Sequence, residues 1–153
     1  MIQRVQTLYL VAAFVCCMVS LMSLLGTFVN EGLTEARMFS LWLTDSHGAH
    51  DLRVAPLFCL AIIAATVQLL TIFLYKNRRM QARVCWLAVV PLLLWYMLWA
   101  AYGFAGIAGV SGTAVYRPTY ACVFPLLSLI FTLMARRGIM ADERMVRAAD
   151  RIR

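Results

Sequence analysis

Two histidines and two aspartates lie within seven residues of one another, in the stretch DSHGAHD. Asp45, His47, His50 and Asp51 carry the imidazole and carboxylate groups that bind zinc or copper in proteins. Imidazoles three residues apart, with a carboxylate on each side, could therefore form a metal site. The same residues, with Ser46 and Gly48 between them, are also typical of a solvated surface loop. The sequence favours the loop and leaves the metal site as an alternative.

The five cysteines are the other residues with possible chemistry. Cys16 and Cys17 are adjacent, whereas Cys59, Cys85 and Cys122 stand singly in apolar stretches, and the chain has no C-x-x-C motif. A thiol oxidoreductase needs cysteine pairs that can exchange disulfides with a partner. Buried cysteine otherwise behaves as a small apolar residue. We therefore predict no catalytic residue and no cofactor.

The composition indicates whether the chain folds in water or in lipid. Hydrophobic residues make up 63% of the 153 and charged residues 14%, with a mean hydropathy of +0.81. A soluble domain is roughly half apolar and about a quarter charged. The chain is too apolar for a small soluble fold, and its charges are clustered. Lipid is the solvent that fits such a sequence.

Four stretches are long enough and free enough of charge to cross a membrane, which takes about 20 apolar residues. We expect spans at about 5–29, 54–75, 84–104 and 118–135, joined by outer loops 30–53 and 105–117. The first stretch could instead be a secretory signal peptide, but its apolar run is longer than such a segment has. The prediction is an all-α integral membrane protein with a four-helix domain at 1–135 and a tail at 136–153.

The basic residues predict which side of the membrane each end faces. Cytoplasmic loops carry an excess of Lys and Arg. With both termini inside, eleven of the fourteen Lys and Arg residues lie on the cytoplasmic side, and only Arg37, Arg53 and Arg117 lie outside. We therefore expect cytoplasmic N- and C-termini.

Small and polar residues predict where the helices pack, because they let backbones approach or hydrogen-bond across a helix pair in lipid. Those at the end of the first span and of the third would bring these two spans together near the outer side. Gln68 is the most polar residue deep in a span, and its amide should bond to a neighbouring helix. The predicted packing residues are Ser20, Ser23, Gly26, Gln68, Gly103 and Gly106.

The tail reads as a short amphipathic helix that starts near Ala141 and bends away from the fourth span at Gly138. Steps of 100° place its apolar residues on one face and its arginines opposite. Asp142 in the first turn would suit the helix dipole, and Glu143 should pair with Arg147 one turn later. It could bind anionic lipid headgroups, but its apolar face is mostly alanine, which favours packing against a partner protein. We expect no nucleic acid. The predicted partner-binding residues are Arg144, Met145, Arg147, Ala148, Ala149, Arg151 and Ile152.

Both ends of the chain resemble a known family. The opening MIQRVQTLYL and the closing DERMVRAADRIR are similar to those of small four-span inner-membrane proteins from Bacteroidetes that are grouped as a domain of unknown function. The resemblance implies a bacterial inner (cytoplasmic) membrane location. It implies no catalytic residue.

The sequence leaves three hypotheses for the function. The favoured one is a non-enzymatic scaffold or accessory subunit of a larger membrane complex that docks through its tail. The first alternative is a small-solute transporter or channel, acting as an oligomer, with Gln68, Thr66 and Thr71 as its polar lining. The second is a metal-binding or enzymatic outer loop.

Overall fold

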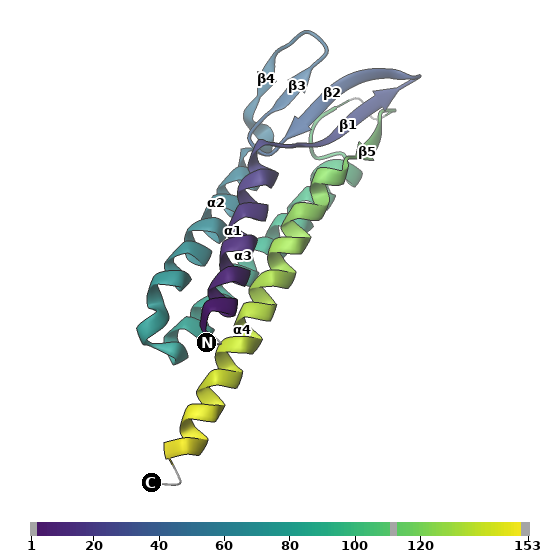
Figure 1. The fold of residues 1–153 in the computed structure, drawn as a ribbon. Coiled ribbons are helices and arrows are strands. Elements are labelled where there is room, and N and C mark those ends of the chain that lie inside the picture. Colours follow the sequence, from purple (N-terminus) through teal and green to yellow (C-terminus); the bar gives the residue numbers. More distant parts are fainter. Residues whose placement is uncertain (1–2, 111–112, 151–153) are drawn as a thin grey trace.

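The structure, a computed structural model, describes residues 3–110 and 113–150, which form a helix bundle with a small sheet at one end (Figure 1). We call this end the sheet end and the opposite one the base. The elements in chain order are α1 (Gln3–Met22), β1 (Leu24–Asn30), β2 (Leu33–Phe39), β3 (Leu43–Asp45), β4 (His50–Asp51), η1 (Leu52–Val54), α2 (Ala55–Phe73), η2 (Leu74–Lys76), α3 (Arg78–Phe104), β5 (Val115–Pro118), η3 (Tyr120–Cys122) and α4 (Val123–Asp150).

Four helical segments within the described residues are long and apolar enough to cross a membrane. They are Val5–Met22, Leu52–Phe73, Arg78–Phe104 and Tyr120–Val146. Large apolar side chains such as Leu8, Leu94 and Met97 are exposed on the outside of the bundle, where lipid would cover them. The prediction of four membrane-crossing helices is confirmed, as expected of a multi-pass membrane protein.

The prediction of an all-α fold is wrong, because a five-stranded antiparallel sheet in the order β4-β3-β2-β1-β5 caps the bundle. The first span was expected to reach residue 29, but α1 ends at Met22 and the next residues form β1. The expected loops 30–53 and 105–117 contain the other four strands or most of their residues. An uncharged run reveals burial but does not distinguish a helix from a strand.

The hairpin between β1 and β2 shows why this segment leaves the helix. Glu31 and Gly32 both have positive φ, of 49° and 86°, as a two-residue type I′ turn requires. The strands on either side pair from Asn30 and Leu33 onward. On the far edge, β1 also pairs with β5, and Phe28 lies opposite Tyr116.

Each helix packs against two neighbours, in the ring α1-α2-α3-α4. α1 and α3 therefore occupy opposite corners, and the predicted approach of the first and third spans is wrong. Gly26 lies in β1 and Gly103 in α3, and a side chain at either would collide with the Tyr116 ring between them. The two glycines make room for a tyrosine from β5.

Tyr116 joins the sheet to the bundle. Its hydroxyl donates to the carbonyl of Leu25, at 3.1 Å, and accepts from the indole Nε1 of Trp99, at 2.9 Å. Burial is the main cause that raises the pKa of the Tyr116 phenol above its ordinary range, so the hydroxyl keeps the proton that it donates.

The other predicted packing residues take different positions. Ser20 is buried and its carbonyl accepts from the hydroxyl of Ser40, while Ser23, just after α1, donates to the Val19 carbonyl in the last turn of α1. Gly106 has a φ of 70° and lies in the turn that follows α3, so it is not in a helix interface.

Gln68 connects two helices at opposite corners of the bundle. It is fully buried, and its side-chain amide donates to Ser128, at 2.8 Å, and Thr132, at 3.0 Å, both on α4. Thr66, two residues earlier in α2, is exposed and donates to the Ile62 carbonyl of its own helix. The two polar residues on α2 therefore face different environments.

We predict that Gln68→Met lowers the free energy of unfolding by about 1 kcal/mol, because two interhelical hydrogen bonds in lipid are lost with little change in volume. Thermal unfolding of the full chain in detergent measures this change. Thr66→Val is the matched control and should have almost no effect. Equal losses from both substitutions would contradict the assignment.

Candidate functional site at the base of the bundle

The end of α4 is the most prominent feature of the base. The predicted separate tail helix is wrong, because α4 runs without interruption from Val123 to Asp150. Its 28 residues span about 42 Å at about 1.5 Å per residue, whereas the hydrocarbon core is about 30 Å thick. α4 extends past the other helices, as Figure 1 shows.

Gly138 does not bend the chain as predicted. It lies inside α4 and faces α1, where an added Cβ would come within 3.0 Å of the Gln6 side chain. The absence of a side chain lets α1 and α4 approach closely, and α1 packs extensively against α4. The predicted hinge is therefore a contact point.

Two carboxylates hold α4 in place just beyond Gly138. Asp142 is 5% exposed and Glu143 8%. The Gln6 amide donates to Asp142 at 2.8 Å, and an Arg78 guanidinium nitrogen lies 3.8 Å from the same carboxylate. Arg79 Nε donates to Glu143 at 2.6 Å. These contacts, which we call the anchor, connect α4 to the first turns of α1 and α3.

The anchor also corrects two predictions about the tail. Asp142 was expected in the first turn of a new helix, but it lies well inside α4. Glu143 was expected to pair with Arg147 one turn later, but it binds Arg79 on α3. Glu143 is buried, and a buried carboxylate needs a charged partner. Arg79, whose side chain is 68% exposed, supplies that partner from α3.

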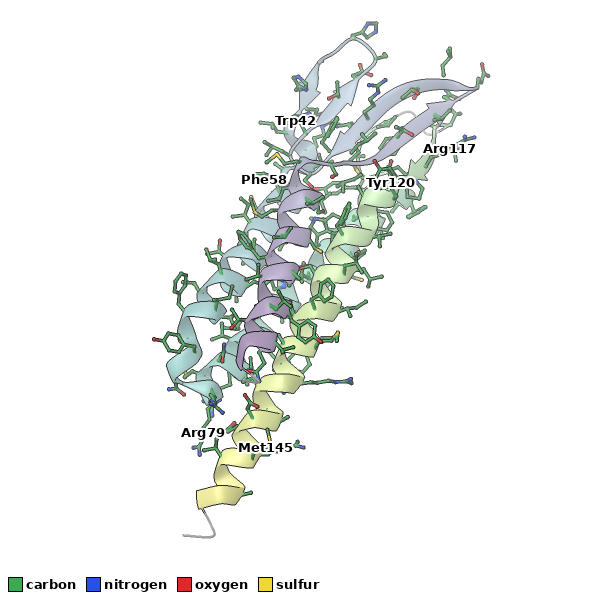
Figure 2. The ribbon with its side chains drawn as sticks, viewed as in Figure 1. Trp42, Phe58, Arg79, Arg117, Tyr120 and Met145 are labelled. Atoms are coloured by element: carbon green, nitrogen blue, oxygen red, sulfur yellow. The ribbon has the colours of Figure 1, made fainter. Side chains whose placement is uncertain are left out.

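Beyond the anchor, α4 exposes a mixed apolar and basic surface. Met145 is 51% exposed and Val146 48%, and Arg144 and Ala148 are also exposed. Figure 2 labels Arg79, beside α4 at the base, and Met145, on the part that projects. We call residues 144–148 the projecting end.

The remaining predicted partner-binding residues are only partly covered by the structure. Arg147 and Ala149 belong to α4, but their side chains lie outside what the structure describes. Arg151 and Ile152 lie outside the described residues altogether.

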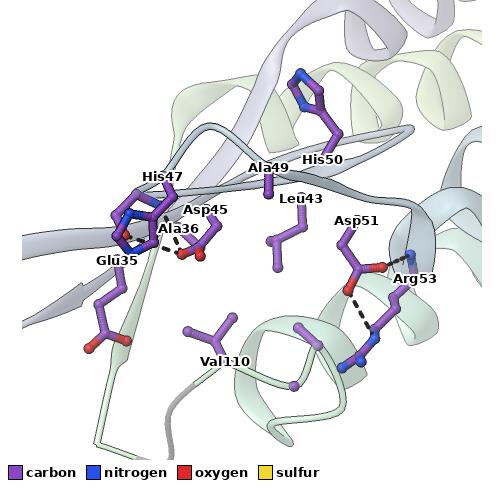
Figure 3. Close-up of a pocket in the computed structure, with 13 residues that line it drawn as sticks. Glu35, Ala36, Leu43, Asp45, His47, Ala49, His50, Asp51, Arg53 and Val110 are labelled. Carbon is purple, nitrogen blue, oxygen red and sulfur yellow. Dashed lines mark hydrogen bonds and ion pairs between the residues drawn. The ribbon is translucent and has the colours of Figure 1, made fainter.

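The four metal-ligand candidates at the sheet end do not converge. His50 bonds to Thr44 at 3.3 Å and packs against the Trp42 ring, whereas Asp51 pairs with Arg53 at 2.9 Å. Figure 3 shows the His50 ring and the Asp51 carboxylate pointing in different directions, with Asp51 turned toward Arg53.

Asp45 uses its carboxylate to accept from the backbone of Ser46, at 2.8 Å. The pocket of about 560 Å³ beside it is lined in part by all four candidates. In residues 3–110 and 113–150, no three His, Cys, Asp or Glu side chains are grouped as metal ligands. Asp45, His50 and Asp51 instead bond to residues of the adjacent strands and turns.

The cysteines also lie apart. Cys17, Cys85 and Cys122 are buried, and the thiols of Cys17 and Cys122 donate to the carbonyls of Ala61 and Leu25. Cys59 is exposed on α2, which differs from the expectation that the single cysteines are buried.

Comparison with known proteins gives one match. A family model described as "Domain of unknown function (DUF4293)" matches residues 2–152, nearly the whole chain. The chain belongs to the DUF4293 family. None of the curated proteins matches this DUF4293 chain. The resemblance to a family of unknown function is confirmed, and the origin in Bacteroidetes stays a prediction.

Sequence reasoning missed the residues that anchor α4 in this DUF4293 protein. Gln6 and Asp142 are 136 residues apart, and Arg79 and Glu143 are 64 apart. The one available signal was the adjacent pair of acidic residues, Asp142 and Glu143, in a tail with an excess of basic residues. These two were interpreted within the tail, although the basic run Arg78–Arg83 offers partners in space.

We predict that Asp142→Asn combined with Glu143→Gln loosens the end of α4, because the ion pairs with Arg78 and Arg79 are lost. Limited trypsin digestion of the protein in detergent should then cleave at residues 144–147 several times faster. Asp51→Asn, which removes an ion pair at the sheet end, is the control. Unchanged cleavage in the double variant would show that the anchor does not hold α4.

Proposed function

We propose that this DUF4293 protein is a non-enzymatic accessory subunit, or scaffold, of a larger membrane complex, and that it docks on its partner through the projecting end of α4. The observation that carries the proposal is the exposure of Met145 and Val146 on a helix that has already left the bundle. The anchor presents this surface in a fixed position.

The energetics favour a protein partner for this surface. Most helical stability in proteins comes from packing of an apolar face, and in residues 3–110 and 113–150 no other helix covers the exposed half of the Met145 or Val146 side chain. Complete burial of a Met or Val side chain contributes about 1.5–3 kcal/mol, and half of each remains available here. Ala148, between the two larger side chains and the end of α4, would let a second helix approach closely.

The charge distribution supports a cytoplasmic base, as the sequence predicts. Arg78, Arg79, Arg83, Arg136, Arg137 and Arg144 belong to the ends of α3 and α4 at the base, whereas Arg37, Arg53 and Arg117 belong to the sheet and its connections. The positive-inside rule places a base of this kind in the cytoplasm. A bacterial inner membrane, with the sheet on the outer side, fits this arrangement.

The alternative of a transporter lined by Gln68, Thr66 and Thr71 has less support. Gln68 is bonded to α4 in the packed interior, and Thr71 donates to the Val67 carbonyl of its own helix. Thr66 is exposed on the outside of the bundle. The three side chains do not face one common pathway.

Site-specific photocrosslinking tests the proposed docking surface. A photoreactive residue is placed at position 145 or 148 of the full chain, in cells that normally make the protein. We expect one discrete protein adduct from each position, because both face the partner. Position 97 on the exposed side of α3 is the lipid-facing control, and position 33 at the tip of the sheet is the control for the opposite end.

A truncation after Arg144 provides the second arm of the experiment. It keeps the anchor, whereas removal of all residues after Gly138 would also remove Asp142 and Glu143. The truncated chain should insert normally but lose the high-mass complex on a native gel. Adducts no more frequent at 145 than at 97, or a complex that survives the truncation, would refute the proposal.

A further inference from the structure

Three adjoining hollows at the base share one residue, Arg136 on α4. Their volumes are about 230, 320 and 340 Å³. The first and third lie where α3 meets α4, and the second is lined by α4 alone. Arg136 lines all three, and Trp86 of α3 lines two of them. We call these three hollows together the Arg136 groove.

The Arg136 side chain is held against Trp86, but not all of its hydrogen-bond donors have partners in the part of the chain that the structure describes. Its guanidinium carbon lies 4.8 Å from the centre of the Trp86 ring, a distance at which a cation interacts with an indole face. Its Nε is buried and has no hydrogen-bond partner among the described residues. A buried donor without a partner is costly, so an acceptor supplied by a ligand would stabilise this arrangement.

The charges around the groove match an anion. Arg83, Arg136, Arg137 and Arg144 contribute to its lining. The carboxylate in the lining belongs to Glu143, which already binds Arg79. Guanidinium groups bind phosphate oxygens through paired hydrogen bonds.

The groove is amphipathic along the helix axis. Toward the base it is basic, whereas toward the sheet end it is lined by Ile130, Leu133 and Met134. Ile130 and Met134 are about 40% exposed, on a membrane-crossing segment. Trp86 lies between the two parts, as expected of an indole at the headgroup level. A small free anion would use the basic part alone.

We propose that the Arg136 groove binds one anionic phospholipid. Its phosphate is held by Arg136, with Arg83 and Arg137 around it, and an acyl chain follows Ile130 and Met134. Basic pockets between membrane helices bind such headgroups in other membrane proteins. This proposal is independent of the docking role of the projecting end.

Native mass spectrometry of the full chain in detergent tests the proposal. The probes are phosphatidylglycerol, phosphatidylcholine with matched acyl chains, and glycerol 3-phosphate. We expect a one-to-one adduct with phosphatidylglycerol, clearly weaker binding of phosphatidylcholine, and no retained glycerol 3-phosphate. Each lost arginine contact should weaken the phosphatidylglycerol adduct about fivefold.

Arg136→Gln and Arg83→Gln are the test variants, and Arg117→Gln at the sheet end is the matched control. Arg83→Gln keeps the test valid if removal of Arg136 from Trp86 disturbs folding. Equal adducts with both phospholipids, or equal losses from Arg83→Gln and Arg117→Gln, would overturn the proposal. Retention of glycerol 3-phosphate as strong as that of phosphatidylglycerol would overturn the lipid assignment in favour of a small-anion site.

Discussion

The pairing of Asp142 and Glu143 with Gln6, Arg78 and Arg79 determines where α4 leaves the bundle. A carboxylate near the hydrocarbon is costly unless it has a charged or hydrogen-bonding partner. The partners here come from the first turns of α1 and α3, so the three helices must meet at this level. The direction of the projecting end and the shape of the Arg136 groove both follow from that meeting point.

The sheet end obeys a second constraint. Lipid supplies no hydrogen bonds to the backbone, so helices are suited to cross it and an open sheet is not. The strands accordingly gather beyond the ends of the membrane-crossing segments. Tyr116 ties this sheet to the bundle through Leu25 and Trp99, and Gly26 and Gly103 leave the space that its ring needs.

The sequence was sufficient to predict four helices long and apolar enough to cross a membrane, because charge-free runs of that length leave few other structures in lipid. It was not sufficient to predict that residues 24–30 form the strand β1. The segment from Leu24 continues the uncharged run of the helix before it. Of the two strands that pair with it, β2 is adjacent in the chain but β5 is far away. Gly138 was misread for a related reason. Its close neighbour is Gln6 on another helix, so a pattern confined to the tail predicted a hinge where the structure has a contact. The metal-ligand candidates are not grouped in the structure, because spacing along the chain does not fix the direction of side chains, and His50 and Asp51 contact different partners.

The central claim is that α4 continues as one anchored helix beyond the bundle and presents residues 144–148 in a fixed position. Hydrogen–deuterium exchange of the unmodified protein in lipid nanodiscs tests it most directly. The account predicts that amides from Gly138 through Arg144 are protected to an extent similar to those of the membrane-crossing part of α4, with protection falling only after the anchor. Rapid exchange that begins at Gly138 would contradict it, because the tail would then be a separate, loosely attached segment.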